Sequence, residues 1–260
     1  EDLDLSYRAQ LAGWKFEFLP DIVIPAELPP DMNGFKSQQH RWTKGSIQTC
    51  KKLLGTIWRS NIPLILKIEA TMHLTSNLGY LLLALLCVLM LPQTMSSTPT
   101  ALRTLIIDIP IFFATTVSIA TFYMVAQRHL NPKGWMRDML MLPMLLALAI
   151  GMSVNNARAV LEALFNYRTP FNRTPKYGDA NKPTLTRRAG YLPLTSLLPL
   201  IEIVFAAYFA FCAWHATMLG QWTSVPFIFL FFIGFSYVAS KSIAFWLERW
   251  GLLERSRVPA

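Results

Sequence analysis

Residues 70–91 read ATMHLTSNLGYLLLALLCVLML, and this segment contains no Asp, Glu, Lys or Arg. Segments of similar length and character follow at about residues 104–126, 192–214 and 225–246. Each is close to the ~20 residues that a helix needs to cross the hydrocarbon core of a bilayer. The sequence therefore predicts an α-helical membrane protein with four transmembrane helices.

The composition supports the same fold class. The 260 residues are 53% hydrophobic and only 15% charged, with a mean hydropathy of +0.35, which excludes an ordinary soluble domain. The net charge of +9 does not indicate a nucleic-acid partner, because the cations lie between apolar segments and form no patch interleaved with aromatic residues. The cysteines Cys50, Cys87 and Cys212 are far apart and support neither a disulfide framework nor a zinc site.

The cations also predict how the chain is oriented, since Lys and Arg accumulate in cytoplasmic loops. They cluster in two loops and in the tail: Arg128, Lys133 and Arg137; Arg158, Arg168, Arg173, Lys176, Lys182, Arg187 and Arg188; and Arg249, Arg255 and Arg257. The opposite connections, residues 92–103 and 215–224, hold only Arg103. We expect a multi-pass protein of the plasma (inner) membrane with both ends of this chain in the cytoplasm.

Two segments predict helices on the membrane surface. Residues 46–58 overlap the second half of an amphipathic stretch, 35–57, that carries several cations. Residues 139–165 are apolar at first but short and interrupted by Pro143, and they then become amphipathic. We interpret both segments as interfacial helices within a membrane domain that covers residues 46–260.

Residues 1–45 have the character of a soluble domain. A helix is predicted at 3–12 and ends at Gly13, and a half-alternating strand is predicted at 14–24. We interpret this part as the end of an α/β domain. Because the chain begins without Met, in the middle of a polar motif, we expect it to be the C-terminal part of a longer protein.

Two groups of residues carry candidate chemistry. Glu1 and Asp2 precede a helix, whose positive end favours ionised carboxylates, and one of them could take a proton from a hydroxyl; a capping acid is the alternative. Gln38, Arg41 and Trp42 share one helical face. Arg41 offers a planar fork for a diphosphate, Gln38 amide donors and acceptors, and Trp42 a plate for a sugar ring. An interfacial Arg-Trp anchor is the alternative.

These residues resemble two motifs of the membrane-integrated, processive, inverting family 2 glycosyltransferases, which include cellulose synthases and the mannan and glucan synthase-like proteins. Glu1-Asp2, with Leu3-Asp4-Leu5-Ser6 and Gly13-Trp14, is similar to the family's Thr-Glu-Asp motif, and Gln38, Arg41 and Trp42 are similar to its Gln-x-x-Arg-Trp motif. The resemblance implies that residues 1–45 are the remnant of a cytoplasmic nucleotide-sugar transferase domain. It also implies that Asp2 is the general base, that Gln38 and Arg41 hold the nucleotide diphosphate, and that Trp42 stacks on the acceptor sugar.

A third stretch, Phe171-Asn172-Arg173-Thr174-Pro175-Lys176, lies in the basic loop 166–190. It resembles the family's gating loop, Phe-x-Val-Thr-x-Lys, with Arg173 in place of Val. The resemblance implies that Phe171 seats the loop and that Thr174 and Lys176 contact phosphate oxygens. A loop that serves membrane topology alone is the alternative.

Polar residues inside the predicted spans are candidates for a channel lining. Four of them recur at helical spacing from the residue before the first span into it: Glu69, His73, Asn77 and Tyr80. Glu202 lies within the third predicted span and needs water or a basic partner there. These side chains predict either one wall of a tunnel for a nascent glycan or polar contacts between helices.

The resemblance implies an inverting hexosyltransferase that elongates a β-linked polysaccharide from a nucleotide sugar and couples synthesis to export. The partners implied are the nucleotide-sugar donor, the growing polysaccharide acceptor, the lipid bilayer, and possible export or regulatory subunits. A divalent metal, Mg or Mn, is implied with ligands outside this chain, so the chain itself is expected to hold no metal ligand set and to be inactive alone. The alternatives are a non-processive transferase with a lipid acceptor and a non-catalytic transport subunit.

Overall fold

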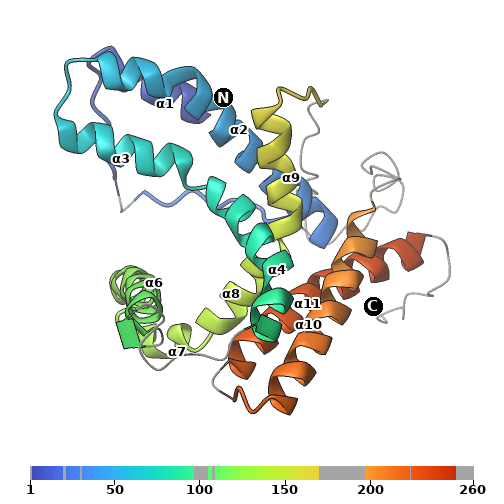
Figure 1. The fold of residues 1–260 in the computed structure, drawn as a ribbon. Coiled ribbons are helices and arrows are strands. Elements are labelled where there is room, and N and C mark those ends of the chain that lie inside the picture. Colours follow the sequence, from blue (N-terminus) through green and yellow to red (C-terminus); the bar gives the residue numbers. More distant parts are fainter. Residues whose placement is uncertain are drawn as a thin grey trace, which may run out of the picture. The chain divides into compact units, whose positions relative to one another are not determined.

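The computed structural model describes residues 2–19, 22–29, 31–96, 105–106, 109–169, 197–222 and 224–249. All the regular elements in these ranges are helices (Figure 1). The chain divides into two compact units: one comprises Glu1–Leu86, Met152–Glu202 and Val238–Ala260, and the other comprises Cys87–Gly151 and Ile203–Tyr237.

Unit 1 is built around α2 (Met32–Arg59), the longest helix, which packs against α1 (Asp2–Leu11), α3 (Leu64–Thr75) and α9 (Ser153–Leu164). The carboxylate of Asp31 caps α2 by accepting a hydrogen bond of 2.7 Å from the Gly34 amide. Gly13, at φ +92°, ends α1 in a backbone conformation that other residues rarely adopt. The predicted helices at 3–12 and 35–57 are both confirmed.

Two apolar clusters hold unit 1 together. In the first, Leu53 and Ile57 of α2 are buried against Ala70 and Leu74 of α3, with Leu3, Tyr7 and Leu11 of α1 packed on them. In the second, Ile47 of α2 is buried against Val160 and Ala163 of α9, with Leu78 and Leu81 beside them. The α1, α3 and α9 helices therefore surround α2 through its apolar positions.

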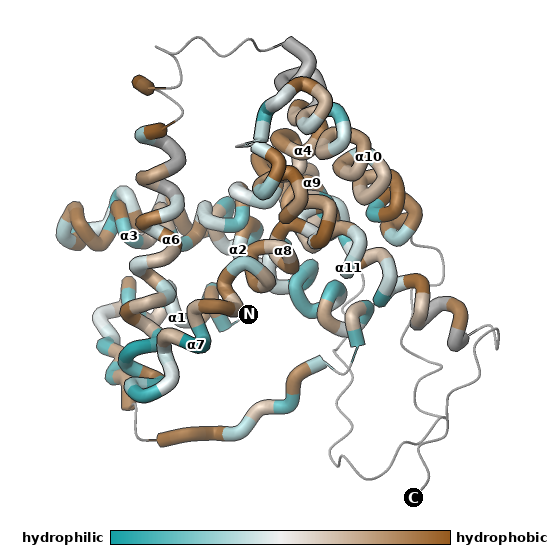
Figure 2. The backbone as a smooth tube through the Cα atoms, turned by 90° about the horizontal axis from the view of Figure 1, so that it is seen from below, coloured by the Kyte–Doolittle hydropathy of each residue, from teal (hydrophilic) through white to brown (hydrophobic). Residues whose placement is uncertain are grey.

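Unit 2 contains α6 (Ile109–Leu130), α7 (Trp135–Met139) and α8 (Leu142–Gly151), together with parts of α10 (Leu198–Met218) and α11 (Val225–Arg249). Stacked rings join the two latter helices, with Phe209 and Phe235 centred 5.6 Å apart at an interplanar angle of 8°. Gly234 of α11 approaches α8 so closely that an added Cβ would lie 2.2 Å from the Ala147 carbonyl oxygen. The strongly hydrophobic colouring of α8 and α10 in Figure 2 agrees with this apolar packing.

Two helices of the described residues are long and apolar enough to cross a membrane, Leu198–Met218 and Val225–Ala244. They match the third and fourth predicted spans. Up to four spans result if each of two bent pairs counts as one: Leu64–Thr75 with Leu78–Met90, and Trp135–Gly151 with Ser153–Leu164. The predicted second span, 104–126, corresponds mainly to α6, which is not among these candidates.

The structure corrects the prediction of one continuous helix over residues 70–91. The segment is divided between α3 and α4 (Leu78–Ser96), which meet at a bend of 50°. Near the bend the hydroxyls of Thr71 and Thr75 donate to carbonyls four residues earlier, at 2.7 Å each, and Ser76 donates to the His73 carbonyl at 2.8 Å. Such local hydrogen bonds compete with the helical ladder and bend helices.

The predicted strand at 14–24 is also wrong for the residues of that range that the structure describes, 14–19 and 22–24, which have no regular structure and are exposed. A strand needs a neighbouring strand to pair with, and the described part of the chain provides none. The predicted interfacial helix 46–58 is the second half of α2, so the proposed boundary between residues 45 and 46 falls within one continuous helix. The predicted segment 139–165 consists mainly of α8 and α9.

Candidate active site

The Gln38, Arg41 and Trp42 side chains lie on one uninterrupted stretch of α2. Their spacing of three and four residues places them on the same side of the helix. Gln38 and Arg41 are partly exposed, and Trp42 is 57% exposed. A large aromatic ring at such exposure, beside an amide and a guanidinium, forms a surface that a polar ring-shaped ligand could contact.

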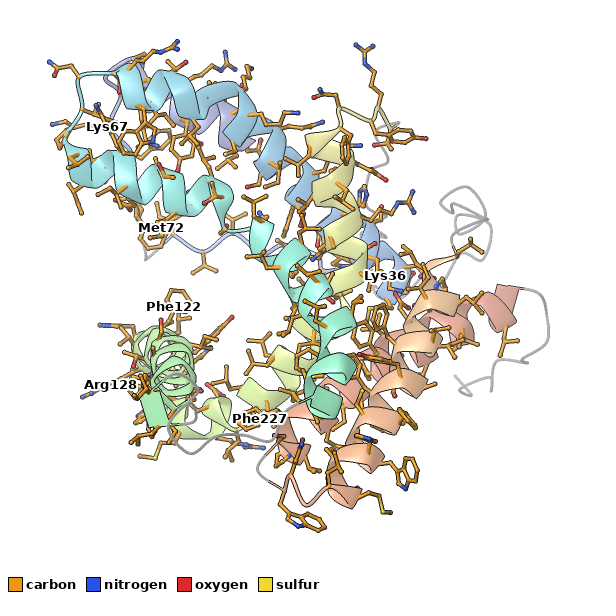
Figure 3. All side chains as sticks on the ribbon, viewed as in Figure 1. Lys36, Lys67, Met72, Phe122, Arg128 and Phe227 are labelled. Atoms are coloured by element: carbon orange, nitrogen blue, oxygen red, sulfur yellow. The ribbon has the colours of Figure 1, made fainter. Side chains whose placement is uncertain are left out.

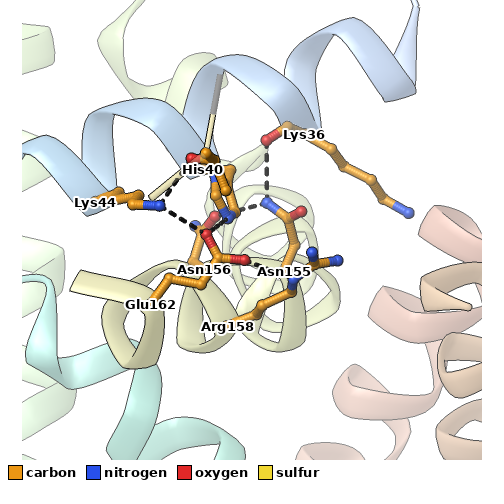
Figure 4. Close-up of polar contacts among 8 residues, drawn as sticks. Lys36, His40, Lys44, Asn155, Asn156, Arg158 and Glu162 are labelled. Carbon is orange, nitrogen blue, oxygen red and sulfur yellow. Dashed lines mark hydrogen bonds and ion pairs between the residues drawn. The ribbon is translucent and has the colours of Figure 1, made fainter. Parts of the chain in front are cut away.

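The opposite side of α2 is buried and basic, and it faces α9 (Figure 4). Its residues Lys36, His40 and Lys44 recur every four positions, and Lys36 and Lys44 are both buried. Lys44 Nζ lies 3.0 Å from Glu162 Oε2, and His40 Nε2 lies 3.1 Å from the same oxygen. Arg158 Nε lies 2.8 Å from the other oxygen of Glu162. One carboxylate of α9 thus joins three basic side chains.

Burial lowers the pKa of His40, although the neighbouring Glu162 carboxylate opposes the shift and Arg158 and Lys44 reinforce it. The imidazole is therefore neutral at pH 7, with Nε2 placed to donate to Glu162 when the proton is on that nitrogen. The contact does not require a charged histidine.

Lys36 connects α2 to two further helices. Its ammonium group donates to the Glu202 carboxylate of α10 and to Ser242 Oγ of α11, the latter at 2.6 Å. Glu202 and Ser242 are both buried. Of the two alternatives predicted for Glu202, a channel lining and a partner for a basic residue, the structure shows the partner.

Helix α1, which begins at Asp2, is fixed on α2 and α3 by polar contacts as well as by its apolar face. Asp4 Oδ1 lies 2.9 Å from Lys52 Nζ of α2, and the Tyr7 hydroxyl lies 2.9 Å from His73 Nδ1 of α3. The hydrogen bond from Lys52 holds the pKa of Asp4 below its usual value, with Arg8 contributing as well. Asp2 itself is exposed at the start of α1.

The candidate acid and the Gln-x-x-Arg-Trp side chains therefore belong to the same packed unit. Lys52, which pairs with Asp4 of α1, is ten residues beyond Trp42 on α2, or about 15 Å along the helix axis at 1.5 Å per residue. Helix α1 is thus attached to α2 about three turns beyond the motif side chains.

Four predicted site residues, Glu1, Phe171, Thr174 and Lys176, lie outside the described residues. The described start of the predicted loop contacts α2. Lys51 Nζ donates to the carbonyls of Ala163 and Leu164, at 3.0 and 2.8 Å, and to Asn166 Oδ1 at 2.8 Å. Lys44 Nζ donates to Thr169 Oγ1 at 2.8 Å.

The predicted polar stripe of the first span does not follow one helix. Glu69 and His73 lie on α3, Tyr80 lies on α4, and Asn77 lies at the bend between them. His73 is already paired with Tyr7 of α1. The stripe is therefore not one continuous wall, and its His73 position serves a contact between helices.

The buried network of Lys36, His40, Lys44 and Glu162 was not predicted from the sequence. The signal that could have found it is the repeat of basic residues at positions 36, 40 and 44 on the side of α2 opposite Trp42. Cations at such spacing ordinarily indicate a solvated face, so the acid on α9 is needed to show that they are buried.

Comparison with known proteins places the chain in a family. The model of the family described as glycosyl transferase family group 2 matches residues 1–247. The chain is 28% identical to the glucomannan 4-beta-mannosyltransferase 7 of Arabidopsis thaliana over 92% of its own length and 42% of the relative's. It is 29% identical to the probable glucomannan 4-beta-mannosyltransferase 9 of Oryza sativa subsp. japonica over 92% of its own length and 46% of the relative's.

The chain thus spans less than half the length of these two relatives. A third relative, the probable glucomannan 4-beta-mannosyltransferase 10 of Arabidopsis thaliana, is 45% identical over 60 residues, which are 23% of the chain and 11% of the relative. No solved structure is significantly similar to the chain. Because the family model matches residues 1–247 of 260, the chain belongs to glycosyl transferase family group 2.

Proposed function

We propose that the protein to which this chain belongs transfers a hexose from a nucleotide sugar to a growing β-linked polysaccharide. The relatives are named as glucomannan 4-beta-mannosyltransferases, so mannose is the first sugar that we propose. The observation that supports the proposal most is the packing of α1, which begins with Asp2, in one unit with the helix that carries Gln38, Arg41 and Trp42.

In the proposed reaction Asp2 is the general base. It takes the proton of the acceptor hydroxyl, the hydroxyl oxygen forms a bond to the anomeric carbon, and the bond from that carbon to the diphosphate oxygen breaks. Attack from the side opposite the leaving group inverts the anomeric configuration. The nucleoside diphosphate leaves with the electron pair of the broken bond.

The side chains of α2 have distinct proposed roles. Arg41 offers a fork of N–H donors whose geometry suits phosphate oxygens, and its charge favours the developing diphosphate. Gln38 donates a hydrogen bond to the same group, and Trp42 stacks on the acceptor sugar. Phe171, Thr174 and Lys176 are proposed to close over the nucleotide.

The described residues contain no group of three or more His, Cys, Asp or Glu that could hold a metal ion. A divalent metal, Mg or Mn, would stabilise the leaving diphosphate, and we propose that its ligands lie in a part of the protein outside this chain.

We further propose that the spans carry the product across the membrane. The proposed topology has four spans in a plasma (inner) membrane protein, with the catalytic side and both ends of this chain in the cytoplasm. Glu69, Asn77 and Tyr80 remain candidates for the lining, and export or regulatory subunits are possible partners.

The test is a donor comparison with the full-length protein in sealed membrane vesicles. Radiolabelled nucleotide mannoses and nucleotide glucoses are supplied from the side that corresponds to the cytoplasm, and products are sized after extraction. We expect labelled polymer, with the highest yield from a nucleotide mannose. Single-sugar lipid products would show a non-processive enzyme instead, and no incorporation from any donor would contradict transferase activity.

A further inference from the structure

On the side of α2 opposite the motif side chains, two buried lysines each make several polar contacts. We call these two sets of contacts the Lys36 anchor and the Lys44 anchor. Lys36 and Lys44 are eight residues apart, about 12 Å along the axis. Gln38, Arg41 and Trp42 all fall between them. The anchors therefore act on the segment of α2 that carries the candidate ligand-binding side chains.

The Lys36 anchor involves residues of unit 1 that lie on three other helices. The ammonium group reaches Glu202 on α10 and Ser242 on α11, as described above. The backbone carbonyl of Lys36 accepts a hydrogen bond of 3.0 Å from Asn155 Nδ2 on α9, and Asn155 is buried. Figure 3 shows Lys36 on α2 near the helices that supply these partners.

The Lys44 anchor has a similar number of partners. Its ammonium group contacts Glu162 at 3.0 Å and Thr169 at 2.8 Å, and its nitrogen lies 5.9 Å from the centroid of the Tyr167 ring. The remaining capacity of the Glu162 carboxylate is used by His40 and Arg158. Both anchors are thus nearly saturated with directed contacts.

Stability alone does not account for these contacts. Burial of a charged pair is costly, and an apolar pair of similar volume is often equally stable or more so. Polar pairs, unlike apolar ones, require the two groups to meet in a particular direction. A shift of α2 by one residue moves each side chain 1.5 Å along the axis and turns it by about 100°. Contacts of about 3 Å would not survive that change, whereas apolar contacts can be re-formed.

We propose that Lys36 and Lys44 are positioning residues, which fix the rotation and axial position of α2 and thereby the direction in which Gln38, Arg41 and Trp42 face the sugar-transfer site. This inference rests on the proposed function. Neither lysine needs to touch the substrate. Their effect on the reaction passes through the orientation of the motif side chains.

The test uses the full-length protein in membranes and an apolar replacement of the first anchor, K36M with E202L. K36M alone would leave the Glu202 carboxylate buried without its cation, which is strongly destabilising in itself. In the double variant Ser242 keeps its hydrogen bond of 2.8 Å to the Val238 carbonyl. We expect normal expression and a normal melting midpoint, but a fall of kcat by about tenfold or more, because small misplacements of binding groups reduce rates strongly.

Two further variants separate positioning from a general loss of structure. Exchange of the two residues, K36E with E202K, restores a pair of opposite sign and should recover part of the lost kcat. The matched control is K67M, which removes a lysine of the same unit whose ammonium donates to the Trp58 carbonyl at 3.0 Å. Lys67 lies on α3, well away from Lys36 in Figure 3, and its loss should leave kcat unchanged.

The rotation of α2 is measured independently of activity, by pulsed electron resonance between spin labels at Gln48 of α2 and Leu161 of α9, both exposed. We expect a wider distance distribution in K36M with E202L than in the wild type. A distance distribution as narrow as that of the wild type, or wild-type kcat in a folded double variant, would overturn the positioning role. Absence of transfer by the wild type would instead refute the proposed function, while the distance measurement would still report on α2.

Discussion

At the scale of single residues, Trp42 has the most specific proposed role. An exposed indole contributes about 1 kcal/mol when it stacks on a ring, so Trp42→Ala should weaken the affinity for the acceptor by about fivefold. The affinity of the nucleotide donor should change little. Initial rates against acceptor concentration, with donor in excess, measure the effect.

Trp58→Ala is the matched control for that variant. Trp58 also lies on α2 and is 46% exposed, but it donates to Thr71 of α3 at 3.0 Å and lies more than four turns from Trp42 by sequence. Equal acceptor constants for Trp42→Ala and the wild type would contradict sugar stacking.

The lowered pKa of His40 allows us to predict how the stability of the folded protein depends on pH. Burial lowers its pKa from the ordinary value of 6.5, so on acidification the unfolded chain takes up the proton before the folded protein does. The stabilisation is complete above pH 6.5 and is lost as the pH falls towards the lower pKa of the folded state. The melting midpoint of the wild type should therefore fall more between pH 7.5 and 5.5 than that of His40→Gln.

That comparison isolates one group, since all other titrations are shared by the two proteins. Glu162, Lys44 and Arg158 face the imidazole, and the glutamine retains a donor for Glu162. Parallel curves for the two proteins would contradict the lowered pKa of His40.

At the scale of elements, the contact of α8 with α11 depends on Gly234. A Cβ there would lie 2.2 Å from the Ala147 carbonyl oxygen, which is backbone and cannot turn aside. Gly234→Ala should therefore destabilise the protein by about 1–3 kcal/mol, seen as a lower melting midpoint in detergent. Gly79→Ala is the control, because a Cβ on Gly79 of α4 meets no atom within 4 Å. If both variants melt alike, the close approach is absent.

The elements also show how far sequence patterns lead. Long apolar or amphipathic repeats predicted α2, α10 and α11, because burial of one face dominates such segments. The bend between α3 and α4 was missed because it follows from hydroxyl-to-carbonyl contacts of Thr71, Thr75 and Ser76, which leave hydropathy almost unchanged. The strand at 14–24 was predicted from alternation alone, and alternation does not supply a neighbouring strand.

The candidate site was also predicted from the sequence only in part. Spacing along one helix predicted that Gln38, Arg41 and Trp42 share a face. No local pattern predicted that Lys44 would meet Glu162, because the two residues are 118 positions apart. Contacts at such separation depend on tertiary packing, which periodicity does not encode.

At the scale of the whole molecule, the chain belongs to glycosyl transferase family group 2 and contains helices that are candidate membrane spans. Lys36 of α2 contacts both α10 and α11 through its side-chain hydrogen bonds to Glu202 and Ser242. A contact of this kind would transmit the position of the spans to the motif helix. Synthesis and export are then proposed to share one helical framework.

The most direct test of this account is the transfer rate of Asp2→Asn in the full-length protein. Asparagine retains the size and one acceptor oxygen of the side chain but cannot accept the hydroxyl proton at neutral pH. With the donor that gives polymer in wild-type vesicles, we predict a loss of initial rate of at least about a hundredfold, with expression and donor binding unchanged. Incorporation near the wild-type rate would contradict the account.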